Sequence, residues 1–217
     1  MKSFCVFGLG RFGQTLALSL AKSGHQVLII DEDSDAVNAL ADAVTSSVVG
    51  DPTSEKVLRA AGVRDYDCAI VCTANNINDN ILLTIMLKDL GMPKIVARAL
   101  NDGHKRVLQR LGVDMIAFPE EDTAEKLAYM LGHDNVIESL DFESGYRIVE
   151  MRIPPSWIGK TLLELNLRRR EKVNVIAVRA KGGPVNCAPS PTRVFAADDI
   201  VSIIGADADV DRLAGKK

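Results

Sequence analysis

Short apolar runs recur along the first half of the chain, and each is followed by a longer segment whose apolar residues are spaced as on one face of a helix. A run and its helical segment together take roughly 20–30 residues, which is the rhythm of β-strand–α-helix–β-strand repeats. We therefore predict a doubly wound parallel sheet, with strands at residues 4–7, 27–30, 47–49, 69–72, 95–97 and 115–117.

Polar residues and glycines mark the ends of the predicted helices. Ser34 and Asp35 are placed to open the second helix, and Thr53, followed three residues later by a lysine, to open the third. Gly62 and Gly91 are expected to close the third and fourth helices, because glycine readily adopts the backbone conformation that ends a helix.

The helical segment at residues 80–90 is apolar on most of its circumference. One face of a sheet covers only one stripe of a helix, so this segment needs a second covering surface. That surface is either another subunit or the second domain of the same chain.

The pattern changes near Asn135, which indicates a second domain. Strand-like runs at residues 136–142 and 146–153 flank a turn, and a short helix at 161–167, strands at 173–178 and 200–204, and a helix at 207–213 follow. We predict domains at residues 1–134 and 135–217, joined through a helix at about 123–132. The fold class is α/β: a doubly wound parallel sheet followed by a small α+β module.

A glycine motif joins the first strand to the first helix and gives the first domain the fingerprint of a Rossmann-like nucleotide-binding fold. Its residues are Gly8, Gly10, Arg11, Phe12 and Gly13. The first glycine makes a tight turn, the second lets backbone approach a phosphate, and the third packs helix against strand. Glycines that only make a turn are the alternative.

Asp31 ends the second apolar run, 31 − 13 = 18 residues past the last glycine, where an acid that binds a ribose is expected. Its carboxylate disfavours NADP, because it repels a 2′-phosphate. Arg11, at the start of the helix, favours the polyphosphate of ATP or ADP over NAD(H), although a solvated Arg11 is the alternative.

The loops after the other strands share the sheet edge at which ligands of open α/β folds bind. These loops supply further candidate binding residues: Asp51, Thr53, Thr73, Ala74, Asn75 and Arg98. Asp51 and Thr53 lie in a Gly-Asp-Pro-Thr segment that could also be a plain turn. Glu120 lies in an acidic cluster that could hold Mg²⁺ or another divalent cation, or could simply start a helix.

Composition narrows the functional classes. The formal charge of −3 gives no basic field for nucleic acid, and no run of 18 apolar residues could span a bilayer. The N-terminus lacks the pattern of a signal peptide, so the cytoplasm is the expected compartment. Cys68 and Cys72 fall on one face of a strand, which favours core packing over metal or redox chemistry.

No histidine has an acid or a nucleophile beside it in a recognisable catalytic arrangement, and no hydrolase or phosphate-loop motif occurs. We therefore expect a regulatory protein that responds to a nucleotide as a signal, rather than an enzyme. The alternatives are a small NAD-dependent oxidoreductase and an NADH-responsive regulator.

Nearly the whole chain resembles a known family, the cytosolic regulatory subunits of bacterial Trk and Ktr potassium-uptake systems, which carry regulator-of-potassium-conductance (RCK) domains. The resemblance rests on the glycine motif with Asp31, on the segment at residues 50–53, and on the segments at 158–165 and 173–178. It implies a nucleotide-binding first domain, dimers that form a ring of eight, and docking on an integral-membrane potassium translocator.

The resemblance also implies roles for single residues. Arg11 would contact the terminal phosphates, Asp31 the ribose, Asp51 and Thr53 the adenine side, Arg98 a phosphate, and Glu120 a divalent cation between protomers. Some members of the family bind cyclic di-AMP in the second domain, where the matching residues are Arg168, Asn174, Val175, Ile176 and Pro191. Because Arg168 begins a run of three arginines, a plain solvated run is the alternative.

Overall fold

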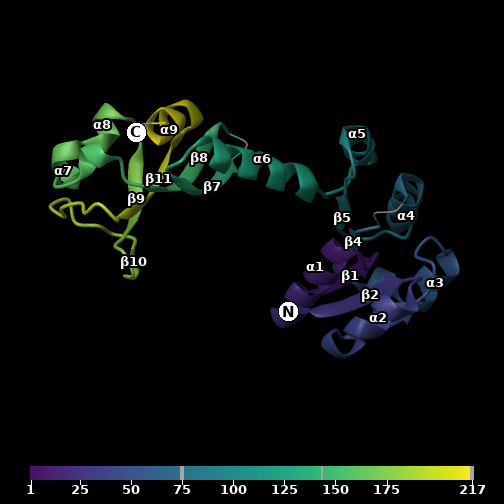
Figure 1. Ribbon diagram of the computed structural model, residues 1–217. Coiled ribbons are helices and arrows are strands. Elements are labelled where there is room, and N and C mark those ends of the chain that lie inside the picture. The colour runs from purple at the N-terminus through teal and green to yellow at the C-terminus, as the bar shows by residue number, and fades with distance from the viewer. Residues whose placement is uncertain (74–75, 143, 216–217) are drawn as a thin grey trace. The chain divides into compact units, whose positions relative to one another are not determined.

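The computed structural model describes residues 1–73, 76–142 and 144–215 of the 217-residue chain. The chain forms two compact units, Met1–Pro119 and Glu120–Lys217, which are described separately (Figure 1). Helix α6 (Pro119–Gly132) groups with the second unit from Glu120 onward; we predicted that this helix joins the two domains and that the second begins at residue 135.

In the described part of the first unit, six strands form one parallel sheet in the order β3-β2-β1-β4-β5-β6, which confirms the predicted doubly wound fold. The strands are β1 (Ser3–Phe7), β2 (Gln26–Asp31), β3 (Ser46–Val49), β4 (Cys68–Val71), β5 (Ile95–Arg98) and β6 (Met115–Ala117). The helices are α1 (Arg11–Lys22), α2 (Ser34–Leu40), α3 (Glu55–Ala60), α4 (Ile77–Asp89) and α5 (Asp102–Leu111), with 3₁₀ turns η1 (Ala41–Ala43) and η2 (Val63–Asp65).

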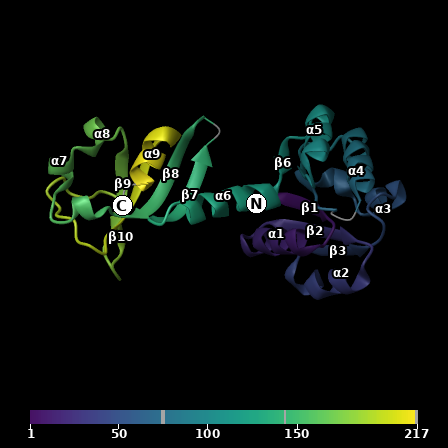
Figure 2. The same ribbon diagram turned by 45° about the horizontal axis from the view of Figure 1, so that its top comes forward.

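Helices cover both faces of this sheet (Figure 2). Alternate strand residues pack against α1 and α2 on one face and against α3, α4 and α5 on the other, so the central strands β1, β2 and β4 are largely buried on both sides. Cys68 and Cys72 lie in the cluster that contains α1 and α2, and both thiols are free and buried, as their shared face predicted.

The helix ends differ in part from those predicted. The side chain of Asp33 caps α2 by accepting hydrogen bonds from the N–H groups of Asp35 and Ala36, so the cap lies one residue before the predicted start. Helix α3 begins at Glu55 and not at Thr53, because Thr53 donates its N–H and its hydroxyl to Asp51 Oδ1 at 2.8 and 2.7 Å.

The described strands of the second unit form an antiparallel sheet in the order β10-β9-β11-β8-β7. Helix α9 packs against β11 and β8, and its apolar residues join a core that includes Met151, Trp157 and Val201. The elements are β7 (Val136–Phe142), β8 (Tyr146–Arg152), η3 (Pro155–Trp157), α7 (Leu162–Leu165), α8 (Leu167–Arg170), β9 (Asn174–Arg179), β10 (Val185–Asn186), β11 (Ile200–Ala206) and α9 (Asp207–Ala214).

The short helix predicted at about residues 161–167 is present as α7, but it ends at Leu165, and a second short helix, α8, follows it. Asn166 adopts a left-handed conformation with φ 45°, which ends α7 after a capping box between Thr161 and Glu164. Helix α8 starts at the next residue and carries Arg168.

Arg147 joins several elements of the second unit. Its guanidinium pairs with Asp141 at 2.9 Å and with Asp211 at 2.8 Å, and it lies 4.1 Å from the ring centre of Tyr129. Tyr129 also donates its hydroxyl to Asp211 at 2.9 Å. Strands β7 and β8 and helices α6 and α9 are thus held together by one polar cluster.

Across the described residues, no helix has the length and apolar character needed to cross a membrane.

His104 is buried in the first turn of α5, with 2% of its surface exposed. Its Nδ1 accepts a hydrogen bond from the N–H of Leu100, while its Nε2 has no hydrogen-bond partner among the described residues. Burial lowers the pKa of His104, because a positive charge in this position loses its hydration.

We predict that His104 makes the free energy of unfolding depend on pH. Below about pH 6.5 the unfolded chain takes up a proton at this residue while the native chain resists it, so stability falls by up to about 1.4 kcal/mol per pH unit. Denaturant unfolding of the wild type and of His104→Asn between neutral pH and pH 5 measures the effect. The stability difference between the two proteins should shrink as pH falls; a constant difference contradicts the prediction.

Candidate functional site

The turn between β1 and α1 depends on close backbone approach. Gly8 has φ +87°, and a Cβ placed on it would lie 2.7 Å from the backbone nitrogen of Thr73. A Cβ on Gly13 would lie 2.0 Å from the carbonyl oxygen of Gly8. A Cβ on Gly10 meets no described heavy atom within 4 Å. Packing therefore requires the first and third glycines, whereas the second leaves open space in front of the helix.

A cavity of about 130 Å³ opens at this turn, at the carboxyl end of the sheet where the strand order reverses between β1 and β4. Ligand cavities are usually larger, so a nucleotide bound here would extend past it along the start of α1. The described residues that line it are Gly8, Leu9, Gly10, Asp31, Glu32, Asp51, Pro52, Thr53, Cys72, Thr73, Asn76 and Asp79.

Asp31 is held in place at the end of β2. One carboxylate oxygen accepts the N–H of Leu9 in the glycine turn, and the other accepts the N–H of Asp33 at 2.9 Å. Each oxygen keeps a further lone pair for a ligand hydroxyl. The carboxylate is therefore fixed beside the open space at Gly10.

Arg98 lies near this cavity although it is not among the described residues that line it. Burial raises the pKa of the Cys72 thiol to about 12, and the positive charge of Arg98 partly opposes this rise. The guanidinium of Arg98 lies 5.7 Å from the ring centre of Phe12 on α1. Arg98 is thus next to both the end of β4 and the start of α1.

The structure brings together six of the predicted residues in the described lining: Gly8, Gly10, Asp31, Asp51, Thr53 and Thr73. Arg11, Phe12 and Gly13 follow them on α1, outside the lining. Ala74 and Asn75 lie outside the described residues.

Sequence reasoning missed Glu32 and Asp79 of this cavity, whereas it placed Asn76, with the segment at residues 73–76, at this edge of the sheet. Asn76 caps α4 by accepting the N–H of Asn78, and Asp79 lies in the first turn of the same helix. The cap itself also has a sequence signal, because asparagine before an apolar helical segment indicates the start of a helix. Nothing in the local pattern pointed Glu32 or Asp79 toward a ligand.

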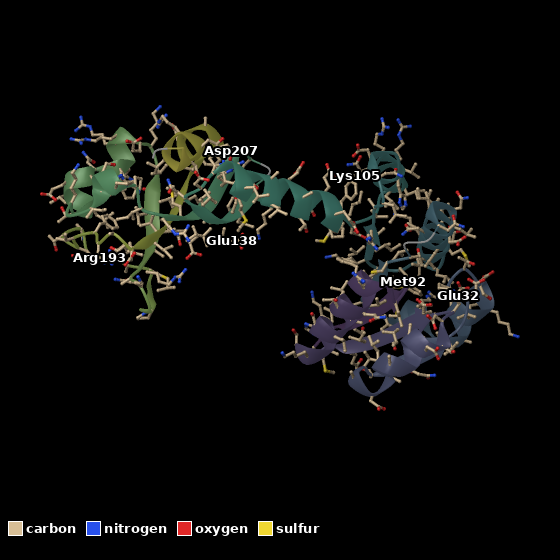
Figure 3. The ribbon with its side chains drawn as sticks, in the orientation of Figure 1. Glu32, Met92, Lys105, Glu138, Arg193 and Asp207 are labelled. Atoms are coloured by element: carbon tan, nitrogen blue, oxygen red, sulfur yellow. The ribbon has the colours of Figure 1, made fainter. Side chains whose placement is uncertain are left out.

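The described lining carries the carboxylates of Asp31, Glu32, Asp51 and Asp79 and no lysine or arginine (Figure 3 labels Glu32). A ligand must therefore present hydrogen-bond donors to this part of the cavity. An anionic group of a ligand would fit better at the N-terminus of α1, where the N–H groups of the first turn and the helix dipole favour an anion.

Glu120 lies in the first turn of α6. Among the described residues of this chain, no cluster of three or more histidine, cysteine, aspartate or glutamate side chains could hold a metal ion. The predicted cation site at Glu120, which the resemblance places between protomers, stays a prediction.

A second cavity of about 550 Å³ lies in the second unit. It contains Arg168, Asn174, Val175 and Pro191, which were predicted, but not Ile176. The other described lining residues are Leu162, Leu163, Asn166, Leu167, Val173, Cys187, Ala188 and Pro189.

One wall of this second cavity is a loop without regular structure, and a partly buried ion pair stabilises this loop. Arg193 (Figure 3) donates to both oxygens of Asp199 at 2.8 and 2.9 Å, and Asp199 also accepts the N–H of Ala196. Burial raises the pKa of the Asp199 carboxyl, but these donors outweigh it and hold the pKa below its usual value. Pro191, on the same loop, accepts the N–H of Leu163 at 2.9 Å.

Comparisons with known proteins agree with this architecture. The TrkA-N domain matches residues 4–119 and the TrkA-C domain residues 148–216. The chain is 37% identical to the Ktr system potassium uptake protein C of Bacillus subtilis, over 97% of this chain and 95% of that protein.

Solved structures show the same fold. The GsuK channel bound to NAD matches 98% of this chain at a TM-score of 0.57 and 26% identity, and GsuK bound to ADP matches 60% at 0.53 and 29%. The matched parts cover 38% and 34% of those chains, so this chain spans less than half the length of either.

Two alanine substitutions should separate packing from ligand access in the glycine turn. Gly10→Ala is expected to keep the thermal unfolding temperature close to that of the wild type but to abolish nucleotide binding, because its methyl group fills the open space. Gly13→Ala is expected to lose stability by several kcal/mol, since its methyl group collides with the Gly8 carbonyl. Thermal unfolding with and without ATP measures both effects. Retained binding in a stable Gly10→Ala protein would contradict this assignment.

Proposed function

The chain belongs to the RCK family of potassium-uptake regulatory subunits with TrkA-N and TrkA-C domains, and we propose that it binds a nucleotide to gate a membrane potassium translocator. The observation that carries the proposal is the open space at Gly10 beside the fixed carboxylate of Asp31. Structural neighbours that contain NAD or ADP support nucleotide binding.

ATP or ADP is the proposed physiological ligand, with NAD(H) as the second candidate. Arg11 occupies the first turn of α1, where its charge adds to the helix dipole in front of a terminal phosphate. Asp31 would bind the ribose, Asp51 and Thr53 would lie on the adenine side, and Arg98 would contact a phosphate. A divalent cation such as Mg²⁺, with Glu120 among its ligands, would neutralise the terminal phosphates.

Gating follows from differential binding. A ligand shifts an equilibrium only as far as it binds one state better than another. A triphosphate that engages Arg11 and a cation would favour one arrangement of the assembly, whereas a diphosphate leaves these charges without their partner. The two nucleotides would thus favour different states of the translocator.

The proposed assembly is a ring of eight subunits, formed from dimers, on the cytoplasmic side of the membrane. Helix α4 supports an interface, because Leu82 and Ile85 expose 47% and 38% of their surfaces although its other face is buried in the sheet. Uncovered apolar side chains of this kind are frequent in protein interfaces. The translocator would be an integral-membrane protein supplied by another chain.

The second cavity is the proposed site for cyclic di-AMP. Arg168 offers a positive charge to a phosphate, Asn174 offers amide groups to a base, and apolar residues such as Val175 and Pro191 cover a flat ring.

The chain is related to potassium-uptake proteins over nearly its whole length. This relatedness favours a role as a regulatory subunit of potassium uptake over a small NAD-dependent oxidoreductase or an NADH-responsive regulator.

A complementation experiment tests the function. In Bacillus subtilis cells whose potassium uptake is impaired by loss of Ktr system potassium uptake protein C, this chain is expected to restore uptake, measured as the rate of potassium accumulation. Gly10→Ala, expressed to the same level, should not restore it, because the proposed signal is the bound nucleotide. Failure of the wild-type chain, or full rescue by Gly10→Ala, would contradict nucleotide gating.

The role of Arg11 can be tested by comparing nucleotides. Arg11→Ala is expected to weaken ATP about tenfold or more and ADP much less, since a charge-assisted hydrogen bond contributes about 1.5–3 kcal/mol. Isothermal titration of the two nucleotides measures this, with Lys22→Ala at the opposite end of α1 as the control for a lost positive charge. Equal losses for ATP and ADP would rule out a terminal-phosphate role.

A further inference from the structure

Asn80 is a fully buried polar residue near the start of α4, with 0% of its surface exposed. Its side-chain Nδ2 donates to the carbonyl oxygen of Thr73 at 3.3 Å and to that of Arg98 at 3.4 Å. These carbonyls follow β4 and end β5, so one amide group bridges the carboxyl ends of two neighbouring strands.

The hydrogen bonds fix the orientation of this amide. Both N–H groups of Asn80 are used on carbonyl oxygens, and a flipped amide would place its oxygen against the same two acceptors. Its Oδ1 is buried and has no hydrogen-bond partner among the described residues. A buried acceptor without a partner lowers the free energy of unfolding, so the arrangement that forms the bridge also destabilises the protein locally.

The two bridged residues belong to the candidate nucleotide site. Thr73 lines the cavity, and its backbone nitrogen is the atom that a Cβ on Gly8 would approach to 2.7 Å. Arg98 reaches the start of α1 through its contact with the Phe12 ring. The bridge at Asn80 thus connects the backbone at Thr73, which borders the glycine turn, to Arg98, which lies beside the start of α1.

We propose that Asn80 is a positioning residue that fixes Arg98 relative to the cavity and thereby sets the affinity for nucleotide phosphates. This inference rests on the proposed nucleotide site and adds to it a residue that touches no part of the ligand. Loss of the bridge lets the end of β5 shift against the end of β4, and a small displacement of a phosphate-binding charge is costly in affinity.

Thr84 provides a matched control on the same helix. It is also fully buried, and its hydroxyl donates to the carbonyl oxygen of Asn80 at 2.7 Å, within the helix. Thr84→Val removes a buried hydrogen bond one turn further along α4 without touching the carbonyl of Thr73 or Arg98. A general loosening of α4 would affect both variants alike.

A double-mutant cycle with Arg98 tests the proposal. ATP affinity is measured by isothermal titration for the wild type, Asn80→Ala, Arg98→Gln and the double variant, and thermal unfolding without nucleotide checks that each is folded. Asn80→Ala is expected to weaken ATP about tenfold in the wild-type background and less than about twofold in the Arg98→Gln background. Thr84→Val should leave ATP affinity unchanged.

Several outcomes would overturn the inference. Equal losses from Asn80→Ala in both backgrounds, no loss at all, or the same loss in Thr84→Val would leave Asn80 a purely structural residue. Should Asn80→Ala not fold, Asn80→Ser, which retains one hydroxyl donor, takes its place in the cycle. A wild-type chain that binds no nucleotide would instead overturn the proposed function, and the inference with it.

Discussion

The close packing of backbone between the glycine turn and the end of β4 is the constraint on which the proposed nucleotide site depends. Gly8 and Gly13 leave no room for a side chain, and this draws the start of α1 onto the two central strands. The same packing leaves Gly10 facing open space and brings the N–H of Leu9 to Asp31. Site geometry and core packing are therefore consequences of one turn.

Regular periodicity explains why the fold and part of the site could be predicted from sequence. Strands buried on both faces appear as short apolar runs, and the glycine motif and Asp31 have fixed spacing within such a repeat. Glu32, Asp79 and Asn80 have no such spacing. Their roles arise where loops from different strands meet, and no local pattern encodes that meeting.

Local polar contacts account for the other differences between prediction and structure. Asp33, and not Ser34, supplies the side chain that caps α2. Asp51 accepts hydrogen bonds from Thr53, so Thr53 does not cap α3. In the second unit, Asn166 breaks one apolar helical pattern into two short helices. Each of these residue types forms hydrogen bonds to nearby backbone or stabilises a left-handed conformation, alternatives that hydrophobic spacing alone does not reveal.

The charge distribution around the first cavity restricts how a nucleotide can lie in it. The carboxylates of Asp31, Glu32, Asp51 and Asp79 repel phosphate but accept hydrogen bonds from ribose hydroxyls and from an exocyclic amine of a base. In the proposed binding mode, phosphates would be directed to the N-terminus of α1, toward Arg11 and Arg98. Two nucleotides that differ by one phosphate would then differ only in their contacts at the N-terminus of α1. The carboxylates of the cavity cannot replace a phosphate contact that is lost there. In the function that we propose, a site with this polarity would hold both ATP and ADP and still distinguish them, as gating by these two nucleotides requires.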